Sequence, residues 1–412
     1  MTPPSTLDNP KPGCHFRLLR KNRVLLGRLR HVTWRGFQLF LALFSLLVVT
    51  MLAQGWTDFG KGASGARLLR MQASPNYQGG HFVNPQPLFN DLGGMIRGLW
   101  HTSDHINPSQ PPPVAKLSAR ALLVPPASGL RVTWFGHSSM LIEIDGKRVL
   151  TDPMWSERAS PLGWLGPKRW YPPAIALEEL PKLDAVIVSH DHYDHLDRGS
   201  IVRLNALGVT FVVPLGVGAH LEYWGVPNAR IVELDWWERT QLSGLTIVCT
   251  PARHASGRFL FDKDSTLWAG YALLGGQHRA YYSGDTGLFP AMRQIGEQLG
   301  PFDVTMIETG QYHRAWPDWH IGPEQAARAH QLVQGKVMLP VHWALLGLAF
   351  HGWTEPAERS MVAARAQHNL LALPRPGQPF EPGVEPRPSQ RWWPEVPWET
   401  SQQHAIVSTQ AE

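Results

Sequence analysis

The sequence predicts an α/β fold of two mixed β-sheets with helices on their outer faces. Three observations favour this class. Strand-like runs alternate with helix-like runs, the first strands form hairpins, and one apolar β-branched run suits a strand buried on both faces. The chain has 412 residues, of which 43% are hydrophobic and 17% charged, so it can bury a full core.

The basic residues are concentrated at the N-terminus. Residues 1–36 hold eight Lys and Arg side chains and one Asp, a net of +7 against +5 for the whole chain. The remainder therefore carries a net charge of −2 and has no excess of positive charge with which to hold phosphate backbones. We expect no nucleic-acid binding. The basic stretch is predicted to be a cytoplasmic tail.

An uncharged apolar run follows the tail. Phe37–Ala53 contains only Gln38, Ser45 and Thr50 as polar residues, and 17 residues just span a hydrocarbon core. We predict an uncleaved transmembrane signal anchor at residues 37–54; a cleaved signal peptide is the alternative. Because basic flanks stay in the cytoplasm, the part of the chain after the span is expected on the outer, periplasmic face of a bacterial inner membrane.

The rest of the chain divides into three segments by composition. Residues 55–127, rich in Gly, Pro, Asn and Ser, are predicted to be a linker and membrane-proximal segment, with a helix at Leu92–Trp100. Residues 128–375 are the predicted main domain, and residues 376–412 are a Pro-rich tail expected to run over the surface. Strands are predicted at Arg131–Phe135, Ser139–Ile144, Arg148–Thr151, Asp184–Ser189, Thr210–Val213, Arg230–Leu234, Leu245–Thr250, Ala280–Ser283, Val304–Ile307 and Val337–Pro340. Helices are predicted at Gly199–Leu207, Phe289–Leu299 and Pro323–Gln334.

The segment Ser189–His195 carries the chemistry. It follows the buried strand directly and contains His190, His192, Asp194 and His195. Imidazole and carboxylate are the ligands that Zn²⁺ takes, and crowding them without a cation would be electrostatically costly. Single candidates follow later apolar runs: His254, Asp285 and His342. We therefore predict a metal site; a proton relay without metal is the alternative.

The order of these motifs resembles the metallo-β-lactamase superfamily and, within it, the N-acyl-phosphatidylethanolamine-hydrolysing phospholipase D family. The similarity runs from Phe82 to Pro374. The matching passages are Thr151–Pro153, Arg158–Pro161, Gly166–Arg169, Ser189–Asp197, Val213–Gly216, Val232–Glu238, Gly284–Gly287, Gly300–Asp303, Pro323–Glu324 and His342–Trp343. The resemblance implies an αββα sandwich that holds two zinc ions.

The resemblance also implies roles for single residues. His190, His192 and His254 correspond to ligands of one zinc, and Asp194, His195 and His342 to ligands of the other. Asp285 corresponds to the bridging carboxylate, and a water held between the ions becomes the nucleophile. Asp152 resembles the acid behind the metal ligands, although a turn-forming Asp before Pro153 is equally compatible with the sequence. His320 resembles a histidine that contacts the phosphate or leaving group; a structural histidine is the alternative.

The expected activity is therefore hydrolysis of N-acylphosphatidylethanolamine or related glycerophospholipids to phosphatidic acid and N-acylethanolamine. The expected partners are a phospholipid substrate and the bilayer, and a homodimer is compatible with the sequence. A lactonase or small-molecule phosphodiesterase is the alternative enzyme, and a non-catalytic membrane scaffold the alternative class. The chain departs from the family in its spanning segment and in Glu308–Tyr312, which puts an acid near the site edge.

Overall fold

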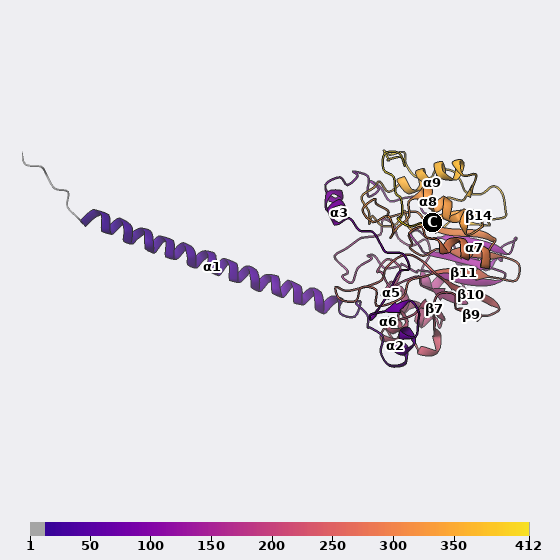
Figure 1. Cartoon of the computed structure of the whole chain (residues 1–412), viewed down its shortest axis with the longest axis horizontal. Coiled ribbons are helices and arrows are strands. Elements are labelled where there is room, and N and C mark those ends of the chain that lie inside the picture. The colour runs from indigo at the N-terminus through magenta and orange to yellow at the C-terminus, as the bar shows by residue number, and fades with distance from the viewer. Residues whose placement is uncertain (1–12, 412) are drawn as a thin grey trace, which may run out of the picture. The chain divides into compact units, whose positions relative to one another are not determined.

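The computed structural model describes residues 13–411, with side chains from residue 33 onward. The chain forms two units, Met1–Trp56 and Thr57–Glu412. Among its described residues, the first unit contains one helix, α1 (Gly13–Gly55), drawn in Figure 1. The first twelve residues of the predicted basic tail lie outside the described residues. The helix begins well before residue 37 because the basic stretch is rich in Leu and Arg, which are strong helix formers.

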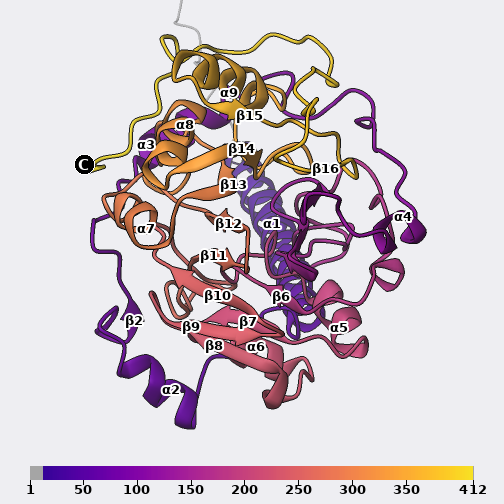
Figure 2. The same cartoon turned by 90° about the vertical axis from the view of Figure 1, so that its right-hand side faces the viewer.

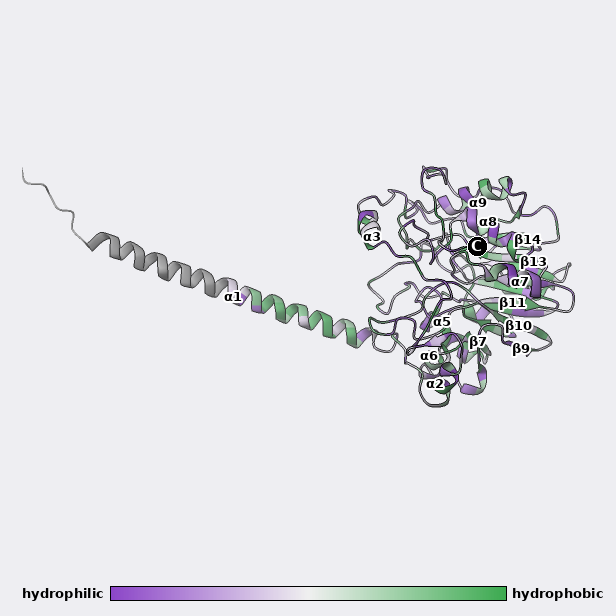
Figure 3. Ribbon diagram, viewed as in Figure 1, coloured by the Kyte–Doolittle hydropathy of each residue, from purple (hydrophilic) through white to green (hydrophobic). Residues whose placement is uncertain are grey.

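The C-terminal part of α1 has the composition of a membrane span. Thr33–Gly55 has a mean hydropathy of 2.2, and no residue of its most apolar window is buried. In the ribbon of Figure 3 this stretch of α1 is coloured mostly as hydrophobic. Its length and composition are those of a membrane anchor or a signal sequence.

The second unit contains two seven-stranded mixed sheets, which confirms the predicted fold class (Figure 2). The first sheet has the order β16-β3-β4-β5-β6-β7-β8, antiparallel as far as β5 and parallel from there to β8. Its strands are Pro379–Phe380, Leu130–Trp134, Met140–Ile144, Lys147–Thr151, Ala185–Ile187, Phe211–Pro214 and Ile231–Leu234.

The second sheet has the order β15-β14-β13-β12-β11-β10-β9, with β9 to β12 antiparallel and β12 to β15 parallel. In the same order, its strands are Leu370–Leu371, Gly335–Val341, Phe302–Glu308, Arg279–Tyr282, Gly270–Leu274, Leu245–Thr250 and Arg239–Leu242. The sequence patterns missed β9, β11 and the two-residue β15. The edge strand β9 has a partly exposed polar pattern with little apolar signal.

Three hydrophobic cores define the layers. The largest lies between the sheets and joins Val132 and Ile142 of the first sheet to Ile247 and Val304 of the second. Another packs the outer face of the first sheet against α5 (Arg198–Ala206) and α6 (Gly218–Tyr223), and a third packs the second sheet against α7 (Ala291–Leu299) and α8 (Pro323–Leu332). The helix α9 (Glu355–Ala366), which the sequence patterns missed, adjoins α8. The architecture is therefore an αββα sandwich.

The segments on either side of the predicted main domain pack into the same unit. Residues 57–127 form α2 (Gly65–Gln72), β1 (Tyr77–Gln78), β2 (His81–Phe82), α3 (Leu92–Leu99) and α4 (Ala119–Leu123). The C-terminal segment, expected to run over the surface, is partly buried: Trp393 is 5% exposed and Ile406 3% exposed. Trp392 stacks on the buried Trp343 and Trp393 packs edge-on against it, so the tail is part of the core.

Candidate metal centre

Three histidines converge at the carboxyl end of β6. His190 and His192 lie in the loop that follows this strand, and His254 lies in the loop after β10. His192 Nδ1 is 2.9 Å from His190 Nε2 and 3.3 Å from His254 Nε2. Each of the three residues offers a ring nitrogen within reach of one common ion. The ends of two strands from different sheets therefore bring together the first predicted ligand group.

The second predicted group lies beside the first. Asp194, His195 and His342 each offer an atom to one cluster. The Asp285 carboxylate lies between the groups: its Oδ2 is 3.0 Å from both His195 Nε2 and His342 Nε2, and 3.8 Å from His190 Nε2. Asp285 is thus positioned to serve ions on both sides, as the bridging assignment requires.

The donor set fits a divalent transition metal. Asp285 Oδ1 is buried and accepts no hydrogen bond within the described part of the chain, so this oxygen can bind a metal ion. Burial, with neighbouring imidazoles, holds the pKa of His190 and of His254 well below the usual value, which leaves their lone pairs free to ligate. Burial raises the pKa of Asp285, but the His195 and His342 imidazoles outweigh it and hold that pKa well below its usual range. Neutral imidazoles and ionised carboxylates are what Zn²⁺ and related cations bind.

Asp152 lies directly behind His195. Its Oδ2 accepts hydrogen bonds from His195 Nδ1 at 2.6 Å, from Ser189 Oγ at 2.5 Å and from Tyr282 OH, while its Oδ1 accepts from Ser189 N at 2.7 Å. The carboxylate is fully buried. A carboxylate on Nδ1 fixes the tautomer of the imidazole and turns Nε2 toward the metal. This geometry is that of the outer acid and not that of a turn residue alone.

His320 lies at the edge of the same centre. It lines a cavity of about 290 Å³ together with His192, Asp194 and Asp285. Its Nδ1 is hydrogen-bonded to Glu308 Oε1 and lies 3.9 Å from Asp285 Oδ2. The cavity is completed by Asn90, Met95, Gln311, Trp316, Trp319, His342 and Leu348. His320 therefore faces the space in which a substrate would lie.

Two further residues belong to the centre although sequence reasoning did not assign them to it. His137, in the connection between β3 and β4, has its Nε2 2.8 Å from Asp194 Oδ2, and its ring centroid lies 4.1 Å from that of His342. Burial lowers the pKa of His137 to about 4. Glu308, noted only as an acid near the edge, is hydrogen-bonded to His320 and lies 3.3 Å from His342 Nδ1. Both occupy ends of strands, as the assigned residues do, and that position was the available signal.

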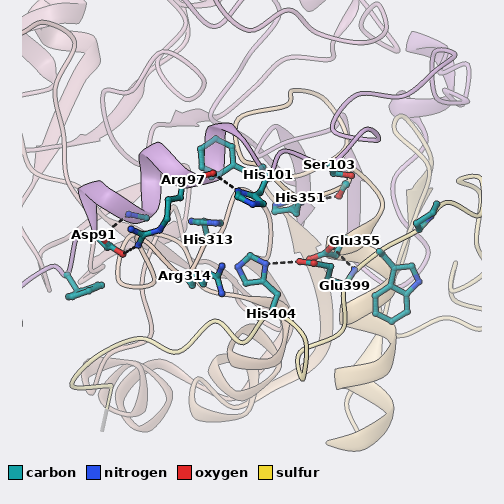
Figure 4. Close-up of a pocket in the computed structure, with 17 residues that line it drawn as sticks. Asp91, Arg97, His101, Ser103, His313, Arg314, His351, Glu355, Glu399 and His404 are labelled. Atoms are coloured by element: carbon teal, nitrogen blue, oxygen red, sulfur yellow. Dashed lines mark hydrogen bonds and ion pairs between the residues drawn. The ribbon is translucent and has the colours of Figure 1, made fainter.

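A larger cavity of about 620 Å³ lies elsewhere and lacks such a centre (Figure 4). His101, His313, His351 and His404 line it, but their ring nitrogens form no metal-type cluster among the described residues. His404 Nδ1 is 2.9 Å from Glu399 Oε2, and His101 Nδ1 is 2.9 Å from the Arg97 carbonyl oxygen. The chemistry is therefore concentrated in the smaller cavity.

Comparison with known proteins agrees with this geometry. Residues 147–343 match the model of the beta-lactamase superfamily domain. An uncharacterised protein of Mycobacterium tuberculosis is 47% identical over 341 residues, which cover 81% of this chain and 91% of the relative. The N-acyl-phosphatidylethanolamine-hydrolyzing phospholipase D 1 of Caenorhabditis elegans is 40% identical over 228 residues, 52% of this chain and 64% of that protein. A UPF0173 metal-dependent hydrolase of Methanopyrus kandleri is 31% identical over 220 residues, 52% of this chain and 84% of the relative.

Proposed function

The chain belongs to the metallo-β-lactamase superfamily of metal-dependent hydrolases, and on this premise we propose that it is a membrane-anchored phosphodiesterase of the phospholipase D type. Its substrate is N-acylphosphatidylethanolamine or a related glycerophospholipid, and its products are phosphatidic acid and N-acylethanolamine. The observation that carries the hydrolytic chemistry is Asp285, whose carboxylate is shared between two histidine-rich groups. The similarity to the Caenorhabditis elegans phospholipase supports the substrate class.

The chain's own residues account for positioning and proton transfer. His190, His192, His254, Asp194, His195, His342 and Asp285 would hold two zinc ions. When bound, such ions polarise a phosphoryl oxygen and lower the pKa of a water molecule. Asp152 keeps the Nδ1 proton on His195. Glu308 holds a proton on Nδ1 of His320 in the same way, and in its imidazolium form His320 can pass the proton on its opposite nitrogen to the leaving alkoxide.

The cavity size bears on how the substrate sits. A cavity of about 290 Å³ holds a phosphate with its immediate substituents but not two acyl chains. The acyl chains of a phospholipid would therefore stay outside the cavity. The small cavity volume also fits a compact substrate, so the second candidate function is a lactonase or small-molecule phosphodiesterase.

The anchor places the enzyme beside its substrate. We propose that Thr33–Gly55 is an uncleaved span with the basic N-terminus in the cytoplasm and the catalytic unit on the outer face of a bacterial inner membrane. Tethering raises the local concentration of a bilayer substrate.

The test is a substrate panel followed by mass spectrometry. Purified full-length protein with zinc should release N-acylethanolamine from N-acylphosphatidylethanolamine, and His190→Ala should abolish both the release and the bound metal. Turnover of lactones or cyclic phosphodiesters with no lipid turnover would favour the second candidate. Lipid turnover by metal-stripped protein at the full rate would contradict the proposal.

A further inference from the structure

A loop of three apolar residues projects from the catalytic unit. Phe259 is 36% exposed, Leu260 81% and Phe261 88%. The Asp262 carboxylate accepts hydrogen bonds from the backbone N–H groups of Arg258 at 3.0 Å and Phe259 at 2.8 Å, which fixes the turn. Single exposed apolar residues are ordinary on protein surfaces. Three exposed apolar residues in succession on a fixed loop indicate that the loop contacts another apolar surface.

This loop packs against the first residues of the catalytic unit. The ring centroids of Phe259 and Phe59 are 4.7 Å apart, and Arg258 Nε donates to the Asp58 carbonyl at 2.9 Å. Phe59 is four residues beyond Gly55, where the candidate span ends, and four residues reach at most about 14 Å. The chain that connects the candidate span to the residue against which this loop packs is therefore short.

The same loop is hydrogen-bonded to the segment Ser189–His195, which carries the candidate metal ligands. Arg258 Nη1 donates to the Asp191 carbonyl at 2.6 Å, and Tyr193 OH donates to the Arg258 carbonyl at 2.7 Å. The Lys263 ammonium lies 5.5 Å from the ring centroid of Trp319, which lines the catalytic cavity. The apolar loop therefore forms part of the rim of that cavity, with a cation beside it.

Helix α3 supplies a second apolar surface at the cavity. Its Met95 lines the cavity. Leu92, Ile96 and Leu99, at helical spacing on one face, are 53% to 69% exposed, and the adjoining Trp100 is 84% exposed. Trp is enriched where proteins meet the headgroup region of a membrane. The exposed stripe thus continues the apolar lining of the cavity outward.

We propose that the Phe259–Phe261 loop and the exposed stripe of α3 insert into the interfacial layer of a lipid bilayer, so that the catalytic cavity opens onto the membrane. This inference rests on the proposed membrane-anchored function. An exposed apolar surface that includes a Trp is the composition that binds the headgroup boundary of a membrane, and the Lys263 ammonium lies beside it at Trp319. A phospholipid could then place its phosphate in the cavity while its acyl chains remain in the bilayer.

Site-specific fluorescence on the full-length chain tests this inference. Leu260→Cys and Leu99→Cys are each made in a Cys14→Ser background and labelled with the environment-sensitive fluorophore NBD. Cys249 is fully buried, and the Cys14→Ser protein alone reports any labelling there. Val362→Cys on α9, 55% exposed, is the matched control. The proteins are reconstituted into vesicles of phosphatidylethanolamine and phosphatidylglycerol, with and without nitroxide-labelled lipid.

The expected result is a shift of NBD emission to shorter wavelength, with strong nitroxide quenching, at positions 260 and 99 but not at 362. Emission and quenching at positions 260 and 99 equal to those at 362 would overturn the proposal. Thermal unfolding of each labelled protein shows whether it is folded. The readout is independent of turnover: insertion without lipid hydrolysis leaves this inference standing and refutes the proposed function, and hydrolysis without insertion does the reverse.

Discussion

Replacing Asp152 by Asn should weaken metal binding without unfolding the protein. The carboxylate accepts four hydrogen bonds in a fully buried position: three at Oδ2, from Ser189 Oγ, His195 Nδ1 and Tyr282 OH, and one at Oδ1, from Ser189 N. An amide of the same shape has one acceptor oxygen. In either orientation its NH₂ group faces a donor: Ser189 N in one, His195 Nδ1 in the other.

The size of the effect follows from that mismatch. Leaving a buried donor unsatisfied costs about 1–3 kcal/mol, which corresponds to a factor of roughly 5 to 150 in an equilibrium constant. Loss of an outer carboxylate on a metal-ligating histidine weakens metal affinity or activity by about 10- to 100-fold in other proteins. We therefore expect Asp152→Asn to bind zinc about 10- to 100-fold more weakly.

The assay is competition for zinc against a chelating dye, with a matched control. Asp184→Asn changes a carboxylate that accepts from Arg148 N at 2.9 Å, before the amino end of β6 and away from the metal loop at its carboxyl end. This control should bind zinc as the unaltered protein does. Zinc affinity within threefold of the unaltered protein in Asp152→Asn would refute the role given to Asp152.

Three other predictions concern proton linkage, catalysis and the core. Burial alone would lower the pKa of His195 and of His342. The Asp285 and Asp194 carboxylates outweigh burial and raise both pKa values well above the usual value for histidine. Both imidazoles are therefore protonated in the metal-free site near neutral pH. Zinc affinity should accordingly rise with pH, by about tenfold per unit for each displaced proton, and calorimetry in buffers of different ionisation enthalpy should detect proton release; an affinity independent of pH contradicts this. His320→Ala should lower kcat by about 10²- to 10⁴-fold while the zinc content stays unchanged, and loss of zinc instead would make His320 a ligand. Trp393→Ala should lower the free energy of unfolding by about 3–5 kcal/mol in urea titration, because Trp393 is part of the inter-sheet core. A loss below about 1 kcal/mol would show that Trp393 does not contribute to this core.

Local patterns were sufficient for the parts of the fold with strong periodicity. The buried strand before Ser189 and the two successive hairpins formed by β3, β4 and β5 follow from apolar runs and turn residues. The metal ligands were found because each follows a strand, and the carboxyl ends of β6 in the first sheet and of β10, β12 and β14 in the second meet at one edge of the sandwich.

Other features depend on tertiary contacts that local patterns do not encode. Phe380 and Trp393 sit in a Pro-rich stretch whose burial follows from pairing of β16 with β3 and from the edge-on contact of Trp393 with Trp343. His137 looks like a loop residue, and its position at φ 52° against His342 comes from closure of the two sheets. Glu308 ends a strand whose partner in the second sheet carries His342 at its end.

The most direct test of the central claim is hydrolysis of N-acylphosphatidylethanolamine in water enriched in ¹⁸O by the zinc-restored, full-length protein. Attack of water on phosphorus breaks the bond to the N-acylethanolamine oxygen and places the water oxygen in the phosphate. The account predicts one ¹⁸O in phosphatidic acid and none in N-acylethanolamine, with both products lost when the metal is removed. An ¹⁸O atom in a released fatty acid, or phosphatidic acid formed equally well without metal, would contradict it.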